Sequence, residues 1–161
     1  MGRKGMILIE RPGQEPLEIE YLLIDFEGTL AMDRRVHPKA KDKINLLSKR
    51  LKIYIFAKEE KERVEEVLKR VKAEIVFSNR GEASKQKLEL IQRLGAFRTA
   101  VIGNGIDDLS IMKEAALGMV ILGKEGTSGG LIQIANLVFT DVIDALDFLL
   151  KPLRQRATLG V

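Results

Sequence analysis

Two segments far apart in the sequence place acidic residues at or shortly after the end of a short apolar run. In the first, LLIDFEGTL at 22–30, Asp25 follows the apolar run and precedes a Gly-Thr turn. In the second, VIGNGIDDLSIMKEAALGMVI at 101–121, a Gly-Asn-Gly turn is followed by the adjacent carboxylates Asp107 and Asp108. An α/β protein binds metals and phosphates where a strand ends in such residues before a helix. We therefore expect the two strand ends to meet at one edge of a parallel sheet.

A lysine in a third segment is spaced to enter the same site. Lys87 is followed at +3, +4 and +7 by Leu90, Ile91 and Leu94, which places all four residues on one helical face. That face is the one we expect to be buried, whereas Lys85 points to the other side. A lysine whose stem merely follows an apolar stripe to solvent has the same spacing. If a basic group enters the site from this helix, Lys87 is the better candidate.

Each acid also has a purely structural interpretation. Asp25 can end a strand in a turn, and an aspartate at 107 or 108 can stabilise a helix N-terminus through the helix dipole. Capping explains one acid, but it explains less well two acids together with Asn104 and two glycines.

The composition limits the kind of metal site and the kind of protein. The chain has no cysteine and a single histidine, His37, so a metal must be held by oxygen ligands, which favours Mg²⁺. With 161 residues, 45% of them apolar, we expect one globular domain over 1–161. No apolar run approaches the roughly 20 residues of a membrane span, and we expect a cytoplasmic protein. The 31% charged residues are compatible with a thermophile.

The net charge of +4 fits a solvated surface or the attraction of phosphorylated ligands. The chain has no Trp, two Tyr and no basic stripe interleaved with aromatic residues. We therefore do not expect a nucleic acid as partner.

Apolar runs and amphipathic segments alternate from residue 21 to about 150, which we take as the core. This alternation predicts an α/β fold in three layers, Rossmann-like, with a mainly parallel sheet covered by helices on both faces. The predicted strands are 21–25, 51–57, 73–77, 99–102, 118–122 and 137–140, and the predicted helices are 38–50, 58–71, 85–94, 106–116, 127–135 and 142–149.

Three further expectations concern the ends of elements and of the chain. Ser84 is expected to cap the helix at 85–94 and Gly95 to end it. Apolar alternation around Pro12-Gly13 predicts a hairpin over 5–20 that adds an antiparallel edge to the sheet. Residues 151–161 read as a tail, and no segment is long enough for a separate cap domain.

These motifs carry a resemblance to the haloacid dehalogenase superfamily of phosphohydrolases, over 21 to about 150. The chain is most similar to the cap-less soluble relatives of the P-type ATPase phosphorylation domain. Asp25-Phe-Glu-Gly-Thr-Leu30 resembles the first motif, Lys87 with its apolar partners the third, and 103–108 the acidic fourth. The run at 118–141 resembles the segment that follows in the ATPases, and 151–159 is similar to the end of archaeal members. The resemblance implies a strand order of 5-4-1-2-3, counted from the strand at 21–25.

The chemistry that the resemblance implies is phosphoryl transfer through an aspartyl phosphate on Asp25. Mg²⁺ would be bound by Asp25, by the backbone carbonyl of Glu27, and by a side chain from the fourth motif (Asn104, Asp107 or Asp108). Lys87 would offset negative charge, and Glu27 would act as general acid and base. The Gly28 turn and the backbone after Ala57 would lie beside the phosphoryl group. The substrate would be a phosphorylated compound, and an open site favours a homo-oligomer, either dimer or tetramer.

Three positions depart from the family pattern. Glu27 stands where the phosphatases have Asp, which lengthens the acid–base arm by one methylene. Ala57 replaces the Ser or Thr that ends the second motif, and the lost hydrogen bond is worth about 1.5–3 kcal/mol. In the fourth motif Asn104 stands where Asp is usual and Asp107 where Asn is usual. Relative to the family pattern, the carboxylate expected at position 104 is therefore found at position 107.

The leading interpretation is a Mg²⁺-dependent phosphatase. The alternative is a catalytically weakened relative that binds Mg²⁺, phosphate or a protein partner. A receiver domain of the response-regulator type also combines an α/β fold with a phosphorylated Asp. Its acceptor lies on a middle strand after an acid pair on the first, which is the reverse of the order found here.

Overall fold

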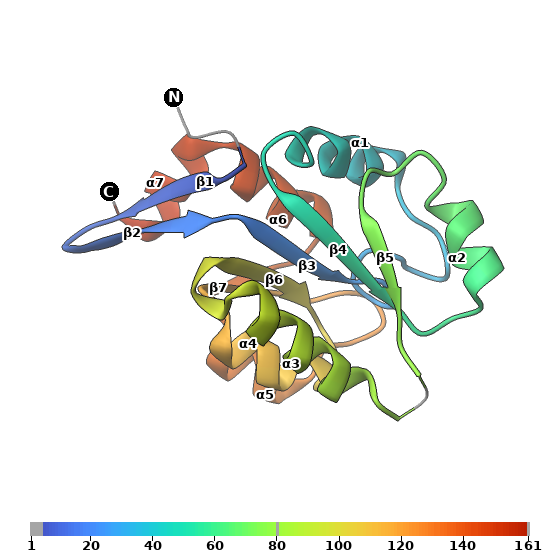
Figure 1. Cartoon of the computed structure of the whole chain (residues 1–161). Coiled ribbons are helices and arrows are strands. Elements are labelled where there is room, and N and C mark those ends of the chain that lie inside the picture. The colour runs from blue at the N-terminus through green and yellow to red at the C-terminus, as the bar shows by residue number, and fades with distance from the viewer. Residues whose placement is uncertain (1–4, 80, 161) are drawn as a thin grey trace.

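The computed structural model describes residues 5–79 and 81–160, so the predictions for 1–4, 80 and 161 lie outside the described residues. Six parallel strands form its central sheet in the order β5-β4-β3-β6-β7-β8. Figure 1 labels the strands of this sheet from β3 to β7. The predicted order of the first five strands is confirmed, and the sixth lies at the edge beside β7. The strands are β3 (Tyr21–Asp25), β4 (Lys52–Ala57), β5 (Glu74–Phe77), β6 (Thr99–Gly103), β7 (Leu117–Ile121) and β8 (Leu137–Phe139).

The centre of the sheet is buried on both faces. Leu22, Leu23 and Ile24 of β3 are all buried, and β6 and β7 are buried along their whole length. A parallel strand covered on both sides is apolar at every position rather than at alternate ones. This burial explains why the strands appear in the sequence as continuous apolar runs.

Helices cover the two faces and make the predicted three layers. The apolar side chains of α1, α2 and α6 pack in one core cluster, and those of α3, α4 and α5 pack in a second on the opposite face (Figure 1). The helices are α1 (Pro38–Leu47), α2 (Lys61–Val67), α3 (Ala83–Leu94), α4 (Leu109–Glu114), α5 (Gly129–Ile134), α6 (Val142–Leu150) and α7 (Pro152–Leu159), with 3₁₀ turns at Ala96–Arg98 and Ile106–Asp108.

Two boundary predictions have different outcomes at α3. The helix begins at Ala83 after Glu82, and Ser84 lies inside it, so the predicted Ser84 cap is wrong. Gly95 does end the helix, with a φ of +104° that a residue with a side chain rarely adopts. The predicted helix at 106–116 divides into the turn Ile106–Asp108 and the shorter α4.

The hairpin forms, but it does not extend the central sheet. β1 (Ile7–Arg11) and β2 (Gln14–Ile19) pair antiparallel as a sheet of their own (Figure 1). The reason is topological, because β2 leads directly into β3, whose two edges are already occupied by β4 and β6. The hairpin that precedes β3 therefore finds no free edge beside β3 and pairs only with itself.

The predicted tail at 151–161 is wrong for most of its length, because Pro152–Leu159 form α7. This helix lies against β1 (Figure 1). The buried amide of Gln155 donates to the carbonyl oxygens of Phe148 (2.8 Å) and Leu149 (3.3 Å), which joins α7 to the end of α6.

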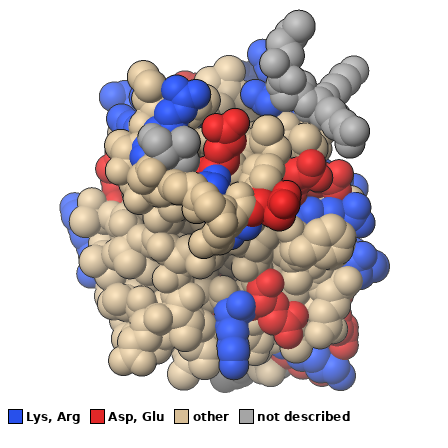
Figure 2. Space-filling model, turned by 90° about the vertical axis from the view of Figure 1, so that its left-hand side faces the viewer, with Lys and Arg blue, Asp and Glu red and all other residues tan. Residues whose placement is uncertain are grey.

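The end of the molecule that carries the hairpin shows basic and acidic side chains scattered among uncharged ones (Figure 2).

Within the described residues, none of the helices combines the length and the apolar character that crossing a bilayer requires.

Candidate active site

The candidate site lies at the carboxyl ends of β3 and β6, where the order of the sheet reverses. From β3 the chain proceeds to β4 and β5 on one side, then crosses to β6 on the other side. Asp25 is the last residue of β3, and residues 104–108 directly follow β6. Crevices at such switch points are where open α/β sheets bind ligands. The expectation that the two acid-bearing strand ends meet at one edge is therefore confirmed.

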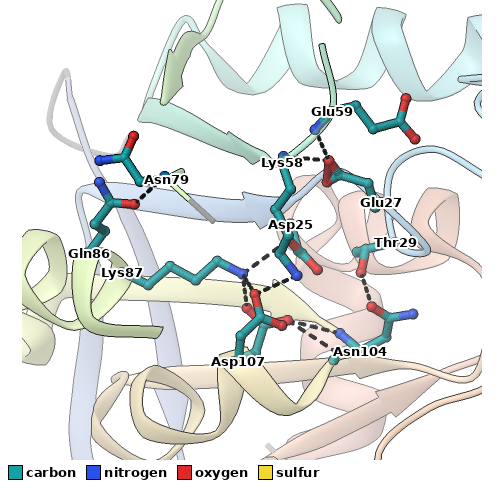
Figure 3. A network of polar contacts seen from close by, with 12 residues as sticks. Asp25, Glu27, Thr29, Lys58, Glu59, Asn79, Gln86, Lys87, Asn104 and Asp107 are labelled. Atoms are coloured by element: carbon teal, nitrogen blue, oxygen red, sulfur yellow. Dashed lines mark hydrogen bonds and ion pairs between the residues drawn. The ribbon is translucent and has the colours of Figure 1, made fainter. Parts of the chain in front are cut away.

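Lys87 lies at the centre of the acidic side chains (Figure 3). Its Nζ lies 3.0 Å from Asp25 Oδ1, 2.8 Å from Asp107 Oδ2 and 2.7 Å from Asp108 Oδ1. Lys87 belongs to the first turns of α3, and its side chain is only 1% exposed. Leu90, Ile91 and Leu94 are buried on the same face, whereas Lys85 is exposed, as the spacing predicted.

Burial and charge act in opposite directions on these groups. Burial raises the pKa of Asp25 well above its usual range, and repulsion from Asp108 adds to that rise, which the Lys87 charge only partly offsets. Burial also acts to raise the pKa of Asp107, but hydrogen bonds from Lys58 and Lys87 outweigh it and the pKa is lowered. Burial acts to lower the pKa of Lys87, but the neighbouring carboxylates raise it by more than burial lowers it. The net pKa lies above its usual value, so this lysine is charged.

The turn after β6 holds Asp108 through its backbone. The second carboxylate oxygen of Asp108 accepts from the amides of Asn104 and Gly105, both at 3.3 Å. A Cβ at Gly103 would lie 2.4 Å from this oxygen. The glycine in the fourth motif is therefore required for the carboxylate to fold back over the strand end.

Asn104 is held by loop contacts. Its Oδ1 accepts from Thr29 Oγ1 at 2.9 Å, and its Nδ2 donates to the carbonyl oxygens of Gly28 (2.7 Å) and Gly126 (3.3 Å). Gly28, with a φ of +73°, lies so close to this amide that a Cβ would be 2.7 Å from Nδ2. The Asn104 side chain therefore ties the β3 turn to the loop that follows β7.

Glu27 turns toward the end of β4. Its Oε1 accepts from the backbone amides of Lys58 and Glu59, the latter at 2.8 Å (Figure 3). Its Oε2 is buried and has no hydrogen-bond partner among the described residues. The structure therefore anchors Glu27 to the loop after β4.

The two backbone positions predicted to lie beside a phosphoryl group are placed as follows. Ala57 ends β4 and is fully buried. The amide of Gly28 donates to the carbonyl oxygen of Ala31 at 2.9 Å, inside the turn that follows β3.

Lys58 is a member of the cluster that the sequence analysis missed. Its Nζ lies 2.8 Å from Asp107 Oδ2, the same oxygen that Lys87 contacts. The sequence placed Lys58 in a charged amphipathic helix, but α2 begins only at Lys61. A signal was nevertheless present, because Lys58 directly follows a strand whose carboxyl end lies at the same sheet edge.

The donor set fits a hard divalent cation. Asp25, Asp107 and Asp108 each offer a carboxylate oxygen, and these three oxygens lie within 4.8 Å of one another. Asp25 and Asp107 make their ion pairs through a single oxygen, so the other oxygen of each can serve a metal. Carboxylate oxygens are the ligands that Mg²⁺ prefers.

No family model matches the sequence. An uncharacterized protein of Methanocaldococcus jannaschii, MJ0073, is 42% identical over 57 residues. The match spans 35% of this chain and 61% of that protein, so the chain covers about three fifths of the length of the relative.

Solved structures give matches over nearly the whole chain. A 3-deoxy-D-manno-octulosonate 8-phosphate phosphatase of Moraxella catarrhalis, solved with magnesium and phosphate, has a TM-score of 0.69 at 14% identity, over 88% of this chain and 90% of that one. A putative subfamily IIIA hydrolase of the haloacid dehalogenase (HAD) superfamily from Legionella pneumophila has a TM-score of 0.68 at 17% identity, over 88% and 87%. A putative phosphatase from Vibrio cholerae has a TM-score of 0.67 at 18% identity, over 96% and 98%. These structural neighbours are hydrolases of the HAD superfamily, and the chain has their fold.

Proposed function

We propose that this chain is a Mg²⁺-dependent phosphatase of the HAD superfamily, a cap-less member that acts through an aspartyl phosphate on Asp25. The observation that carries the proposal is the position of Lys87 Nζ. It lies within 3.0 Å of Asp25 and also contacts two further acids at the switch point of the sheet. A carboxylate at a strand end, a buried ammonium and an adjacent acid pair are the groups that transfer of a phosphoryl group to aspartate requires.

In the first step, one Asp25 oxygen attacks phosphorus and the bond to the leaving oxygen breaks. Glu27 gives its proton to the leaving oxygen, and Lys87 offsets the charge on Asp25 and the phosphoryl group. In the second step, a water attacks phosphorus and gives its proton to Glu27, which releases inorganic phosphate and restores Asp25. Mg²⁺, held by Asp25 with Asp107 or Asp108, would neutralise phosphoryl charge.

The test is turnover of p-nitrophenyl phosphate by the purified chain with and without Mg²⁺. Asp25→Asn is the control, because asparagine keeps the shape of the nucleophile and removes its charge. Mg²⁺-dependent turnover that is lost in D25N supports the proposal. Equal rates in the two proteins, or none in either, exclude it.

A second candidate is a weakened relative that binds Mg²⁺ and phosphate without hydrolysis. Two observations favour it. The Asn104 amide is committed to the Gly28 and Gly126 carbonyls, and the Glu27 carboxylate to backbone amides. Phosphate binding without turnover would identify this candidate. The receiver interpretation is disfavoured, because receivers have the sheet order 2-1-3-4-5, and here the first parallel strand is third from the edge.

We further propose a phosphorylated small molecule as the substrate class and self-association as the means of covering the site. The segment between β3 and α1 spans only residues 26–37, which leaves no room there for a lid of its own.

A further inference from the structure

We propose that Lys58 binds the transferring phosphoryl group and replaces the hydroxyl that Ala57 lacks. This inference rests on the proposed function, because it assigns a residue to the same phosphoryl site. It starts from the lack of free hydrogen-bond donors for a phosphoryl group at the end of β4. Ala57 is buried and offers no side-chain donor, and the next two amides donate to Glu27.

Lys87 cannot supply the missing donor. An ammonium group has three N–H bonds, and Lys87 Nζ already contacts three carboxylates, those of Asp25, Asp107 and Asp108. The side chain is 1% exposed, so it has no route to a new partner unless one of these ion pairs breaks. Lys87 can therefore offset charge at the site through these ion pairs, but it has no N–H bond left to donate to the phosphoryl group.

Lys58, unlike Lys87, has free N–H bonds and is accessible to a ligand. Its side chain is 44% exposed, and its Nζ has one ion-pair partner in the described part of the chain, Asp107 Oδ2 at 2.8 Å. Figure 3 shows this side chain extending from the end of β4 toward Asp25 and Asp107. Two N–H bonds are therefore available to an oxygen that arrives beside Asp25.

The position of Lys58 is set by Glu27. The Glu27 carboxylate accepts from the backbone amide of Lys58, so the residue two positions after the nucleophile holds the start of this loop. A phosphoryl group near Asp25 would also face the three carboxylates of the cluster. The exposed ammonium of Lys58 offsets that repulsion at the mouth of the site.

The experiment is calorimetric titration of inorganic phosphate into the Mg²⁺-loaded full chain. The variants are Lys58→Met, which removes the charge, and Lys58→Arg, which keeps it. The matched control is Lys61→Met, three positions along, whose 65% exposed side chain pairs with Glu65 and lies over the Phe77 ring, away from the acidic cluster. We expect phosphate to bind about tenfold more weakly to K58M, and within about twofold of wild type to K58R and K61M.

Equal affinity of wild type and K58M overturns the inference, and so does a wild type that binds no phosphate. Unfolding temperatures of the four proteins, measured on the same samples, show whether K58M is folded. If K58M is misfolded, the phosphate affinity of K58R is compared with that of wild type instead. K58R keeps the positive charge, so a folded K58R that has lost phosphate affinity also counts against a charge-based role. Aryl phosphate turnover is measured in parallel. Lys58-dependent binding without turnover removes the phosphatase proposal and leaves Lys58 as the phosphate ligand.

Discussion

The ammonium of Lys87 lies 3.0 Å from Oδ1 of Asp25, although 62 residues separate them in the chain. The pair joins the first turns of α3 to the end of β3, and both side chains are almost fully buried. The carboxylates around Lys87 keep its buried ammonium charged, whereas Lys87 offsets only part of the cost of burying the Asp25 charge. The contact therefore ties the chemistry of the candidate site to the stability of the fold.

Asp25→Asn is expected to stabilise the protein at neutral and alkaline pH. Burial and Asp108 raise the pKa of Asp25 in the folded state, so its contribution to stability is present below the unfolded pKa and is lost as pH rises through the folded pKa. Asparagine has no such loss. In urea titrations without divalent cations, we expect D25N to exceed wild type by about 1 kcal/mol at pH 8. The difference should shrink toward pH 4, and a D25N that is less stable at pH 8 contradicts this explanation.

Asn104→Asp, which restores the acid usual in the family, is expected to weaken the fold. The Asn104 amide donates to the carbonyl oxygens of Gly28 and Gly126, and a carboxylate oxygen cannot. The buried carbonyl oxygen of Gly28 and the more exposed one of Gly126 would then face a third acceptor, at a cost of about 1–3 kcal/mol in the free energy of unfolding. Urea denaturation measures this loss. A variant as stable as wild type that binds Mg²⁺ more tightly would show that the loop contacts are dispensable.

Glu27→Gln separates the structural role of Glu27 from its role in proton transfer. The glutamine Oε1 can still accept from the amides of Lys58 and Glu59, so we expect the unfolding temperature to change little. It cannot transfer a proton, so turnover of an aryl phosphate should fall by about 100-fold or more. Glu62→Gln on the exposed surface of α2 is the matched control. Undiminished turnover in E27Q assigns proton transfer to another group.

The sequence was sufficient for features that depend on local pattern. Continuous apolar runs located the parallel strands, and the spacing after Lys87 identified its buried face. Features that depend on long-range contacts were missed. The sequence of α7 has no apolar stripe, and its buried residue is Gln155, which bonds to the end of α6. The direction of the Glu27 side chain depends on a loop 31 residues away, and the ion pair of Lys58 depends on Asp107, which follows a different strand. No local pattern reports either contact.

Asp147 on α6 is expected to make the fold sensitive to acid. Its side chain is only 8% exposed, accepts from Lys43, and has Lys151 (3.6 Å) and Arg154 (3.5 Å) nearby. Burial acts to raise its pKa, but the Lys43 hydrogen bond and the three positive charges lower it. Its contribution to stability is therefore present above the unfolded pKa near 4, and is lost as pH falls through the lower folded value.

Asp147→Asn should therefore lose about 1.5–3 kcal/mol at pH 7, measured by urea denaturation. The gap to wild type should close as the pH falls from the unfolded pKa through the lower folded pKa of Asp147. Asp144→Asn, a half-exposed position that pairs with Arg154 at 3.7 Å, is the matched control and should change little. An equal loss in both variants contradicts the assignment to Asp147.

The central claim is that Asp25 is the phosphoryl acceptor. Beryllofluoride forms a stable mimic of an aspartyl phosphate, and ¹⁹F NMR of the full chain with beryllofluoride and Mg²⁺ reports it directly. We predict a protein-bound resonance in wild type that requires Mg²⁺ and is absent in Asp25→Asn. A wild type without this resonance, or a D25N protein that retains it, would contradict the claim.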